Sequence, residues 1–306
     1  MKAVRLACQA MGTRFELALY GGEVVRLRAA GEEAITEITR LHNELSAFRP
    51  QSQIGRVNAG ASTGPVHVTP ELFSLLTDIR RLSEMTGGAF DVTVGPLLET
   101  WGFRGPRKRA PDETAVSEAL ARVGISHVSL NAQDRTVSFD HAGMRLDLGG
   151  VGKGYALDVA TDVLRSAGVS CALLHGGTST VRAIGQDPAG NPWKIAVRHP
   201  SEDGGEGFMK IVTLEDVAMS VSAASGRVFE AEGRVYGHVI DPRTGYPASV
   251  AELAVVVTPG AMVADALSTG LLVLGEAGIP MLERRVDGFR GKVVAQKFKT
   301  QIQNAK

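Results

Sequence analysis

Hydrophobic and polar residues alternate, or recur with a helical period, along the first third of the chain. Phe15, Leu17 and Leu19 alternate with polar or small residues, which predicts a half-buried strand that ends at the glycine pair 21–22. In the charged segment that follows, hydrophobic residues recur at helical spacing and predict a helix that packs on this strand: Ala34, Ile35, Ile38, Leu41 and Leu45. A second helix is expected to begin at Thr69 and Pro70, with the threonine as N-cap, and to end at the glycine pair 87–88.

The rest of the chain contains mostly short strand patterns. A short helix is expected before Gly124, a hairpin over 127–139, and a helix over 154–167 that ends at Gly168. Further strands are predicted over 172–174, 181–184, 194–197, 209–214, 217–221, 235–240 and 253–258. Their spacing favours antiparallel pairing over repeated β-α-β units. The predicted fold is therefore α+β, with mixed, largely antiparallel sheets and packed helices, in a single domain over 1–306 whose basic tail (291–306) is peripheral.

The composition narrows the class of protein. The chain has 306 residues, of which 44% are hydrophobic and 22% charged, so disordered and fibrous classes are excluded. The 33 basic residues balance the 33 acidic ones, so no net charge draws the chain to nucleic acid or anionic lipid. Cys8 and Cys171 lack the spacing of a disulfide framework or a cysteine zinc site. Neither a membrane span nor the apolar core of a secretion signal is visible, so a cytoplasmic location is expected.

The segment DLGGVGKGYALD (147–158) leads from a predicted strand through glycines into a helix. The start of a helix offers free N–H groups and a positive dipole end to an anion, and Lys153 adds a mobile cation suited to a phosphate. The segment is not a P-loop, because Asp147 stands where the first glycine of that motif would be. A tight strand-to-helix turn with a solvated lysine is the structural alternative.

Two further segments carry candidate chemistry. His238 precedes an Asp-Pro turn at the end of a strand pattern, and a histidine there is suited to removing a hydroxyl proton near neutral pH. Asp265 and Thr269 lie at i and i+4 and so share one helix face, where their oxygens suit Mg²⁺ if a carbonyl of the glycine turn at Gly150 joins them. The alternatives are a strand histidine bonded to backbone and a hydrogen-bonded pair on a helix surface.

Two N-terminal segments complete the set of candidates. The tripeptide that begins at Met11 precedes the first strand pattern, and Ala89, Phe90 and Asp91 follow the glycine pair that ends a helix. These three residues supply an aromatic face beside a hydrogen-bond acceptor, which suits a base or another ring, although Phe90 could equally pack in the core.

Six blocks, in this order and spacing, resemble the ApbE family of FAD:protein FMN transferases from Met11 to about Gly275: MGT, LSAFRPQSQIGRVN, GGAFDVTVGPL, DLGGVGKGYALD, HVIDPRTGYP and ADALST. The resemblance implies an ApbE-like fold related to the T-fold. It also implies the transfer of FMN from FAD to a Ser or Thr of an acceptor flavoprotein, with release of AMP.

The resemblance also implies roles for individual residues. The FAD contacts fall on Met11, Phe48, Ala89, Phe90, Asp91, Asp147 and Lys153. The Mg²⁺ ligands fall on Gly150, Asp265 and Thr269, and His238 falls on the catalytic histidine. Phe48 stands where tyrosine is frequent in the family, which removes a hydroxyl but keeps a stacking face.

Two other functions would use the same residues. A metal-dependent FAD pyrophosphatase would replace the protein hydroxyl by water and release FMN and AMP. A flavin-binding protein would hold FAD without turnover, and the presence of His238, Asp265 and Thr269 argues against it.

Overall fold

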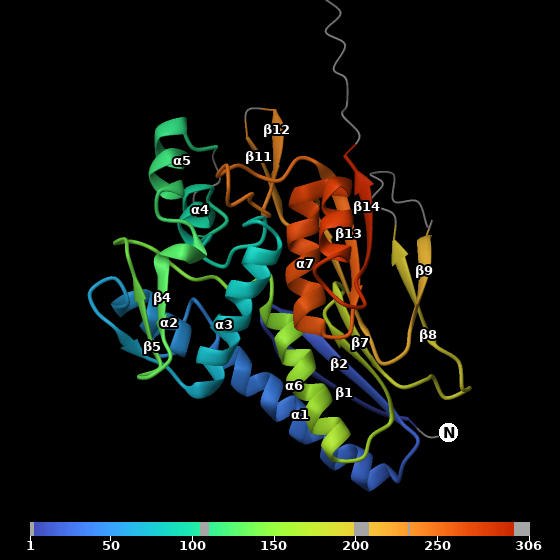
Figure 1. Cartoon of the computed structure of the whole chain (residues 1–306). Helices are drawn as coiled ribbons and strands as arrows, with labels where there is room; N and C mark the ends of the chain where they lie inside the picture. Colours follow the sequence, from blue (N-terminus) through green and yellow to red (C-terminus); the bar gives the residue numbers. More distant parts are fainter. Residues whose placement is uncertain (1–2, 105–109, 199–207, 232, 297–306) are drawn as a thin grey trace, which may run out of the picture.

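A seven-stranded antiparallel sheet forms the centre of the computed structural model, which describes residues 3–104, 110–198, 208–231 and 233–296 (Figure 1). Its strand order is β1-β2-β6-β7-β10-β13-β14. The strands are β1 (Val4–Ala10), β2 (Thr13–Tyr20), β6 (Cys171–Gly176), β7 (Thr180–Ile184), β10 (Ala218–Ala223), β13 (Ala251–Thr258) and β14 (Arg290–Ala295). Each neighbouring pair is antiparallel, which matches the prediction from strand spacing.

Three helices cover one face of this sheet: α1 (Val24–Glu44), α6 (Gly152–Ser166) and α7 (Ala261–Leu274). Phe15, Leu17 and Leu19 of β2 are buried in the core that these helices share with the sheet. The opposite face carries a two-stranded hairpin of β8 (Trp193–Arg198) and β9 (Phe208–Leu214), whose Trp193 and Leu214 pack in a separate hydrophobic cluster. Side chains on one face of the strands therefore pack in the main core with the helices, and side chains on the other face pack in the second cluster.

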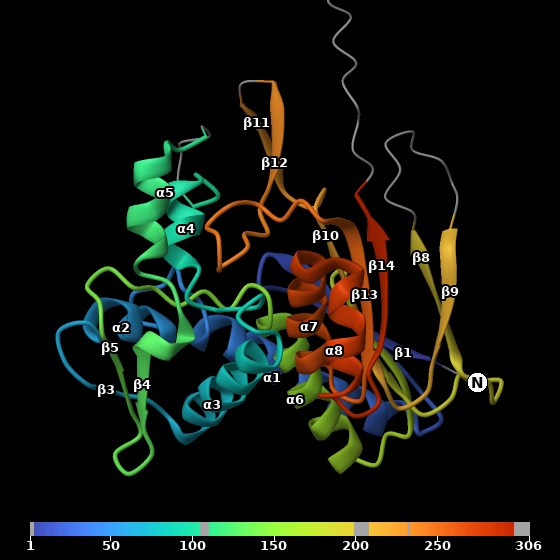
Figure 2. The ribbon, with the colours of Figure 1, turned by 45° about the horizontal axis from the view of Figure 1, so that its top comes forward.

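A smaller unit lies beside the helical layer (Figure 2). It contains α2 (Gln53–Gly60), α3 (Pro70–Met85), α4 (Gly95–Thr100), α5 (Glu113–Leu120), the 3₁₀ helix η1 (Ile125–His127) and a three-stranded sheet of β3 (Val66–His67), β5 (Thr136–Phe139) and β4 (Val128–Asn131). The chain ends its helical part with η2 (Gly275–Gly278) and α8 (Ile279–Glu283).

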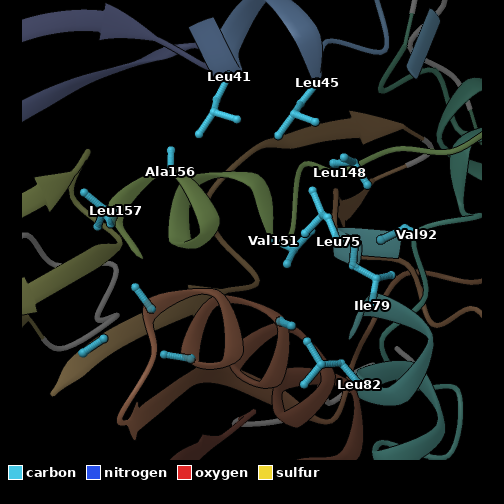
Figure 3. Packing of buried hydrophobic residues seen from close by; sticks show 14 of the residues in the cluster. Leu41, Leu45, Leu75, Ile79, Leu82, Val92, Leu148, Val151, Ala156 and Leu157 are labelled. Carbon is cyan, nitrogen blue, oxygen red and sulfur yellow. The ribbon is translucent and has the colours of Figure 1, made fainter. Parts of the chain in front are cut away.

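Helix α3 joins this unit to the helical layer. Thr69 caps α3 by accepting a hydrogen bond from the backbone of Leu72, and Pro70 occupies the first turn, as the sequence predicts. Buried side chains of α3 pack against those of α6 and of the C-terminal end of α1 in one continuous core (Figure 3): Leu75, Ile79, Leu82, Leu41, Leu45, Ala156 and Leu157.

A third hydrophobic cluster is small and stands apart from the main core. Its six buried residues are Leu97, Trp101, Val116, Ala119, Phe229 and Ile240. Phe229 belongs to β11 (Val228–Ala231), which pairs with β12 (Arg234–Gly237) in a hairpin that projects from the body of the molecule. The indole N–H of Trp101 donates to the backbone oxygen of Gly245 at 2.8 Å, which ties α4 to the loop after β12. We call these six residues the small core.

The structure confirms the α+β class. It also contains elements that no sequence pattern predicted, among them α2, β3, α4, β11 and α8, and it differs from the expected elements elsewhere. Strand β12 ends at Gly237 and does not continue to residue 240, because the chain turns at Asp241 and Pro242. Residues 4–10 form a separate strand, β1, which pairs with β2 and which the hydrophobic pattern did not predict. The start of the expected peripheral tail is ordered: β14 pairs with β13 as the edge strand of the sheet, and only residues 297–306 lie outside the described part.

One helical stretch in the described part, Ala261–Glu283, is long and apolar enough to cross a membrane by length and composition alone. Most of its apolar window is buried inside the fold, where α7 packs against β10 and β13. Its hydrophobicity is that of a core helix.

Candidate active site

A cavity of about 880 Å³ opens between the helical layer, the smaller unit and the loop that follows β12. All the residues singled out from the sequence line it: Met11, Phe48, Ala89, Phe90, Asp91, Asp147, Gly150, Lys153, His238, Asp265 and Thr269. They come from segments up to 258 residues apart (269 − 11), so folding brings the sequence blocks into one place. The volume is ordinary for a site that binds a small molecule or cofactor.

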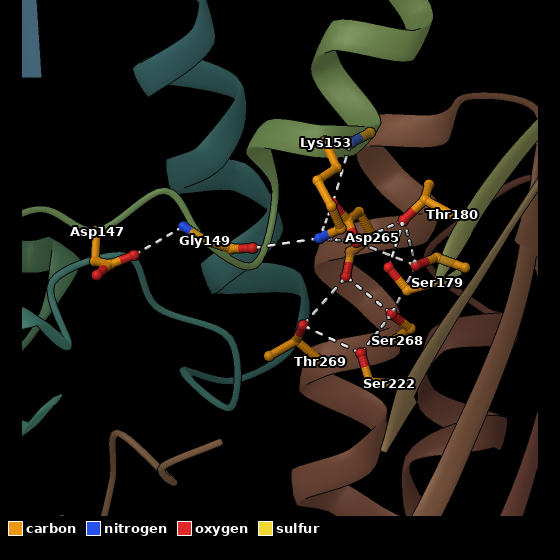
Figure 4. A network of polar contacts seen from close by, with 11 residues as sticks. Asp147, Gly149, Lys153, Ser179, Thr180, Ser222, Asp265, Ser268 and Thr269 are labelled. Atoms are coloured by element: carbon orange, nitrogen blue, oxygen red, sulfur yellow. Dashed lines mark hydrogen bonds and ion pairs between the residues drawn. The ribbon is translucent and has the colours of Figure 1, made fainter. Parts of the chain in front are cut away.

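Asp265, on α7, is the central carboxylate of one half of the cavity (Figure 4). Its side chain is buried, with the residue 3% exposed. Oδ1 accepts hydrogen bonds from the hydroxyls of Thr180 and Ser220, each at 3.1 Å, and Oδ2 accepts one from the backbone of Gly154 at 3.0 Å. These donors hold the carboxylate in one orientation.

Lys153 supplies the positive charge beside this carboxylate. Its Nζ lies 3.3 Å from Oδ2 and 3.4 Å from Oδ1 of Asp265, and 3.5 Å from the carbonyl oxygen of Gly149. The lysine is the second residue of α6, so its ammonium adds to the positive end of that helix. The cavity wall therefore presents a cation and a helix N-terminus together.

Hydroxyl and carbonyl oxygens surround Asp265 on its other side. The Thr269 hydroxyl lies 3.3 Å from the backbone oxygen of Asp265 and 3.4 Å from the Ser222 hydroxyl. A Cβ placed on Gly150 would lie 3.3 Å from Thr269 Oγ1, so the glycine turn and this threonine are neighbours. No cluster of three or more His, Cys, Asp or Glu side chains occurs in the described ranges, so any metal here would rely on one carboxylate plus neutral oxygens.

Two features of α6 bring it close enough to α7 to form this group. A side chain at Gly154 would overlap the backbone oxygen of Ala261, so only glycine fits at that crossing. One turn later, the Asp158 carboxylate accepts hydrogen bonds from the backbone N–H groups of Ala261 and Met262, each at 2.8 Å. Asp158 thus caps the N-terminus of α7 from a neighbouring helix and fixes the axial position of Asp265.

We expect Asp158→Asn to lower the free energy of unfolding by about 2 kcal/mol, because an amide can accept from only one of the two buried N–H groups and directs its own donor at the other. Denaturant unfolding followed by circular dichroism measures this change. Asp162→Asn, an exposed carboxylate one turn along the same helix, is the matched control and should stay within about 0.5 kcal/mol of the parent. Equal stability of the two variants would contradict the capping role.

Met11 forms the turn between β1 and β2 in a left-handed backbone conformation, with φ of 50°. Its N–H donates to Nδ1 of His42 at 3.1 Å. Burial, with a smaller contribution from Arg49, lowers the pKa of His42, which keeps the imidazole neutral and able to accept this bond. His42 was not identified from the sequence; it lies on the hydrophobic pattern of α1 with no motif around it.

Phe48 presents its ring to the cavity and is 72% exposed. The Arg104 guanidinium lies over this ring, 4.0 Å from its centroid, and forms an ion pair with Asp147. Asp147 also accepts from the backbone N–H of Gly149 at 2.8 Å, which shapes the glycine turn. Arg104 therefore links two of the predicted FAD contacts, and no motif of the sequence identified it.

The side chains of Phe90 and Asp91, in the segment 89–91, have different surroundings. Phe90 is buried in the main core and also borders the cavity, and its contact with a ring stays a prediction. Both carboxylate oxygens of Asp91 are used within the protein: Oδ1 accepts from the backbone and hydroxyl of Thr93, and Oδ2 from the backbone of Ile125. Burial raises the pKa of Asp91, and these hydrogen bonds oppose the rise. Its side chain is thus a structural anchor, and contact with a ligand would fall to the backbone of this segment.

His238 lies one residue beyond β12, at the edge of the small core. Its backbone donates to the oxygen of Arg227 at 2.9 Å, and its Nδ1 accepts from the backbone N–H of Arg227 at 3.3 Å. A neutral ring that accepts at Nδ1 carries its proton on Nε2. Burial, followed by the positive charge of Arg227, lowers the pKa of His238, so the ring is neutral at pH 7.

Comparison with known proteins decides the family. The ApbE family model matches residues 11–290, which is most of the chain. The chain belongs to the ApbE family. It is similar to the FAD:protein FMN transferase of Vibrio cholerae, with 36% identity over 251 residues that cover 79% of this chain and 73% of the relative. It is also similar to the FAD:protein FMN transferase of Escherichia coli K12, with 30% identity over 90% of this chain and 79% of the relative.

Solved ApbE structures have the same fold. The ApbE protein of Thermotoga maritima superposes with a TM-score of 0.88 at 29% identity, covering 96% of this chain and 94% of that one. The apo flavinyl transferase ApbE of Pseudomonas stutzeri gives 0.83 at 29% identity, covering 97% and 92%. The expected ApbE-like architecture is therefore confirmed, and these curated and structural relatives are flavin transferase enzymes.

Proposed function

We propose that this ApbE protein transfers FMN from FAD to a Ser or Thr hydroxyl of an acceptor protein, with Mg²⁺ as cofactor and AMP as the leaving group. The observation that carries the proposal is the pairing, in one cavity, of a cationic anion-binding wall with a neutral histidine. The first suits the pyrophosphate of FAD, and the second suits removal of a proton from a hydroxyl. The names of the relatives agree with transfer of FMN from FAD to a protein.

The donor set fits a hard divalent ion. Asp265, Thr269 and the carbonyl of Gly150 would hold Mg²⁺, an ion that commonly binds through one or two carboxylates together with substrate phosphates. The point beside Asp265 already attracts a cation, since the Lys153 ammonium lies there. When bound, Mg²⁺ would neutralise charge on the phosphates and so favour attack at phosphorus.

The chain's own groups account for the remaining steps. Lys153 and the N-terminus of α6 would bind the pyrophosphate, while Phe48, Phe90 and Met11 border the space for the rings of FAD. The acceptor hydroxyl oxygen attacks the phosphorus of the FMN half, the bond from that phosphorus to the AMP oxygen breaks, and AMP leaves. The hydroxyl proton passes to Nδ1 of His238. In the free protein the backbone N–H of Arg227 donates a long hydrogen bond to this atom, and the acceptor hydroxyl would take the place of that donor.

The decisive assay incubates the protein with FAD, Mg²⁺ and candidate acceptor subunits, followed by flavin fluorescence on a denaturing gel. Covalent fluorescence on an acceptor, lost when its target Ser or Thr is replaced by Ala, is the expected result. Release of free FMN and AMP without labelling would instead assign the pyrophosphatase reaction. Retention of intact FAD would assign a flavin-binding protein.

We expect excess chelator to abolish transfer, because one carboxylate and Lys153 alone leave the phosphate charge poorly neutralised. Added Mg²⁺ should restore the rate, and Mn²⁺ should replace it because both prefer oxygen ligands. Covalent flavin on the acceptor is the measurement. Full activity in chelator would contradict the metal assignment.

A further inference from the structure

We propose that Lys153 is a built-in counter-ion of the metal site: its ammonium neutralises Asp265 in the free protein, and a divalent ion displaces it toward the phosphates of FAD. The inference rests on the proposed function for the identity of the site. It concerns a step that precedes chemistry, namely how the site passes from its free to its loaded form.

The geometry puts the ammonium where a metal would compete with it. Nζ of Lys153 lies within 3.3–3.5 Å of both Asp265 carboxylate oxygens and of the Gly149 carbonyl oxygen. A Mg²⁺ ion bonded to the same carboxylate would stand about 2.1 Å from its oxygen. Two cations so close to one carboxylate repel strongly in a partly buried site, so the metal and the ammonium compete for these oxygens.

Burial explains why the free protein keeps a cation there. The side chain of Asp265 is 5% exposed and that of Lys153 is 19% exposed, so the carboxylate is largely removed from water. Hydroxyl and amide donors orient the carboxylate but do not cancel its charge, and an uncompensated buried charge is costly. Over the described ranges, Lys153 is the only basic side chain that forms an ion pair with Asp265.

The displaced ammonium can reach the place proposed for the pyrophosphate of FAD. Lys153 is rooted in the first turn of α6, which faces the cavity, and its four-carbon stem can turn without moving the helix. Metal binding would therefore deliver the ammonium to the place where the pyrophosphate binds. It follows that the metal binds weakly to the free protein and more tightly once FAD phosphates accept the lysine.

The first test measures Mn²⁺ binding to the FAD-free protein by electron paramagnetic resonance titration. Lys153→Met should bind Mn²⁺ about tenfold more tightly than the parent, as expected if the ammonium covers the carboxylate ~90% of the time. Lys194→Met, an exposed lysine of β8 outside the cavity, should bind like the parent. A melting curve with and without Mg²⁺ checks folding, and Lys153→Met should gain the larger upward shift with the ion. Unchanged or weaker binding in Lys153→Met overturns the inference.

A second test uses the unmodified sequence, so it does not depend on a variant that folds. Acylation of lysines by an amine-reactive ester, read by peptide mass spectrometry with Lys194 as internal standard, should label Lys153 several-fold faster in Mg²⁺ than in chelator. Faster labelling supports displacement. Unchanged labelling, even with tighter binding in Lys153→Met, would mean that the lysine only repels the ion from a distance and would overturn displacement.

Asp265→Asn separates this inference from the metal site itself. Loss of Mn²⁺ binding in that variant, with the predicted gain in Lys153→Met, supports both. Parent and Lys153→Met proteins that bind no Mn²⁺ would overturn the metal site and the inference together. A parent that binds Mn²⁺ through Asp265 but shows no effect of Lys153→Met would leave the proposed function standing and remove the counter-ion role alone.

Discussion

His238→Ala is expected to lower the rate of FMN transfer about 10²- to 10⁴-fold while FAD affinity stays nearly unchanged, because the histidine is assigned to the proton and not to FAD. The side chain packs at the edge of the small core and accepts one long hydrogen bond, so the melting temperature should change little. The measurements are FAD fluorescence titration, thermal melting and covalent labelling of an acceptor on the same preparation. His67→Ala, an exposed imidazole of β3 away from the cavity, is the matched control.

The pH profile tests the same assignment without a variant. Burial lowers the pKa of His238 below its ordinary value of about 6.5, and the base acts only when neutral. Transfer should therefore be level near neutral pH and fall as the pH drops through this lowered pKa.

Normal transfer by folded, FAD-loaded His238→Ala protein, or loss of FAD affinity in parallel with activity, would remove the general-base role.

Asp265→Ala is expected to weaken Mg²⁺ binding by at least about 100-fold and to reduce transfer correspondingly, because it removes the only carboxylate predicted to hold the ion. High Mg²⁺ should partly restore the rate, since Thr269 and the FAD phosphates remain. Transfer measured as a function of Mg²⁺ concentration separates the change in metal affinity from the change in the maximal rate.

Two comparisons control this second result. Asp287→Ala removes an exposed carboxylate that does not line the cavity, and it should leave the Mg²⁺ dependence unchanged. A melting curve excludes unfolding as the cause of inactivity, because the variant also leaves Lys153 without its partner. An unaltered Mg²⁺ dependence in folded Asp265→Ala protein would show that Asp265 is not a ligand.

Local patterns predicted the parts of the fold whose causes are local. The cap at Thr69, the helix end before the glycine pair 87–88 and the helical face of Asp265 and Thr269 depend on residues within one or two turns, and all three are present. Strand alternation likewise predicted β2, which pairs with β6 in the expected antiparallel sense. The end of β12 was misplaced because hydrophobic residues continue past Gly237 into the loop, where Ile240 packs in the small core instead of extending the ladder.

Contacts between distant segments could not be read from the sequence. His42 holds Met11 across 31 residues, and Arg104, which follows α4, covers Phe48, which precedes α2. Asp91 appeared as a candidate ligand contact, yet its carboxylate turned out to be occupied by backbone donors, one of them 34 residues away. Pairing of this kind depends on how the elements pack, which residue types and spacing do not specify.

The small core has a consequence for how the protein loses activity. The residues proposed to hold the metal and the phosphates lie on α6 and α7, which pack in the main core, whereas His238 follows β12 at the edge of the small core, which has six buried residues. Cooperative units of a protein open with different free energies, and few buried contacts mean a low one. We therefore expect local opening of this hairpin region to end activity under milder conditions than global unfolding does.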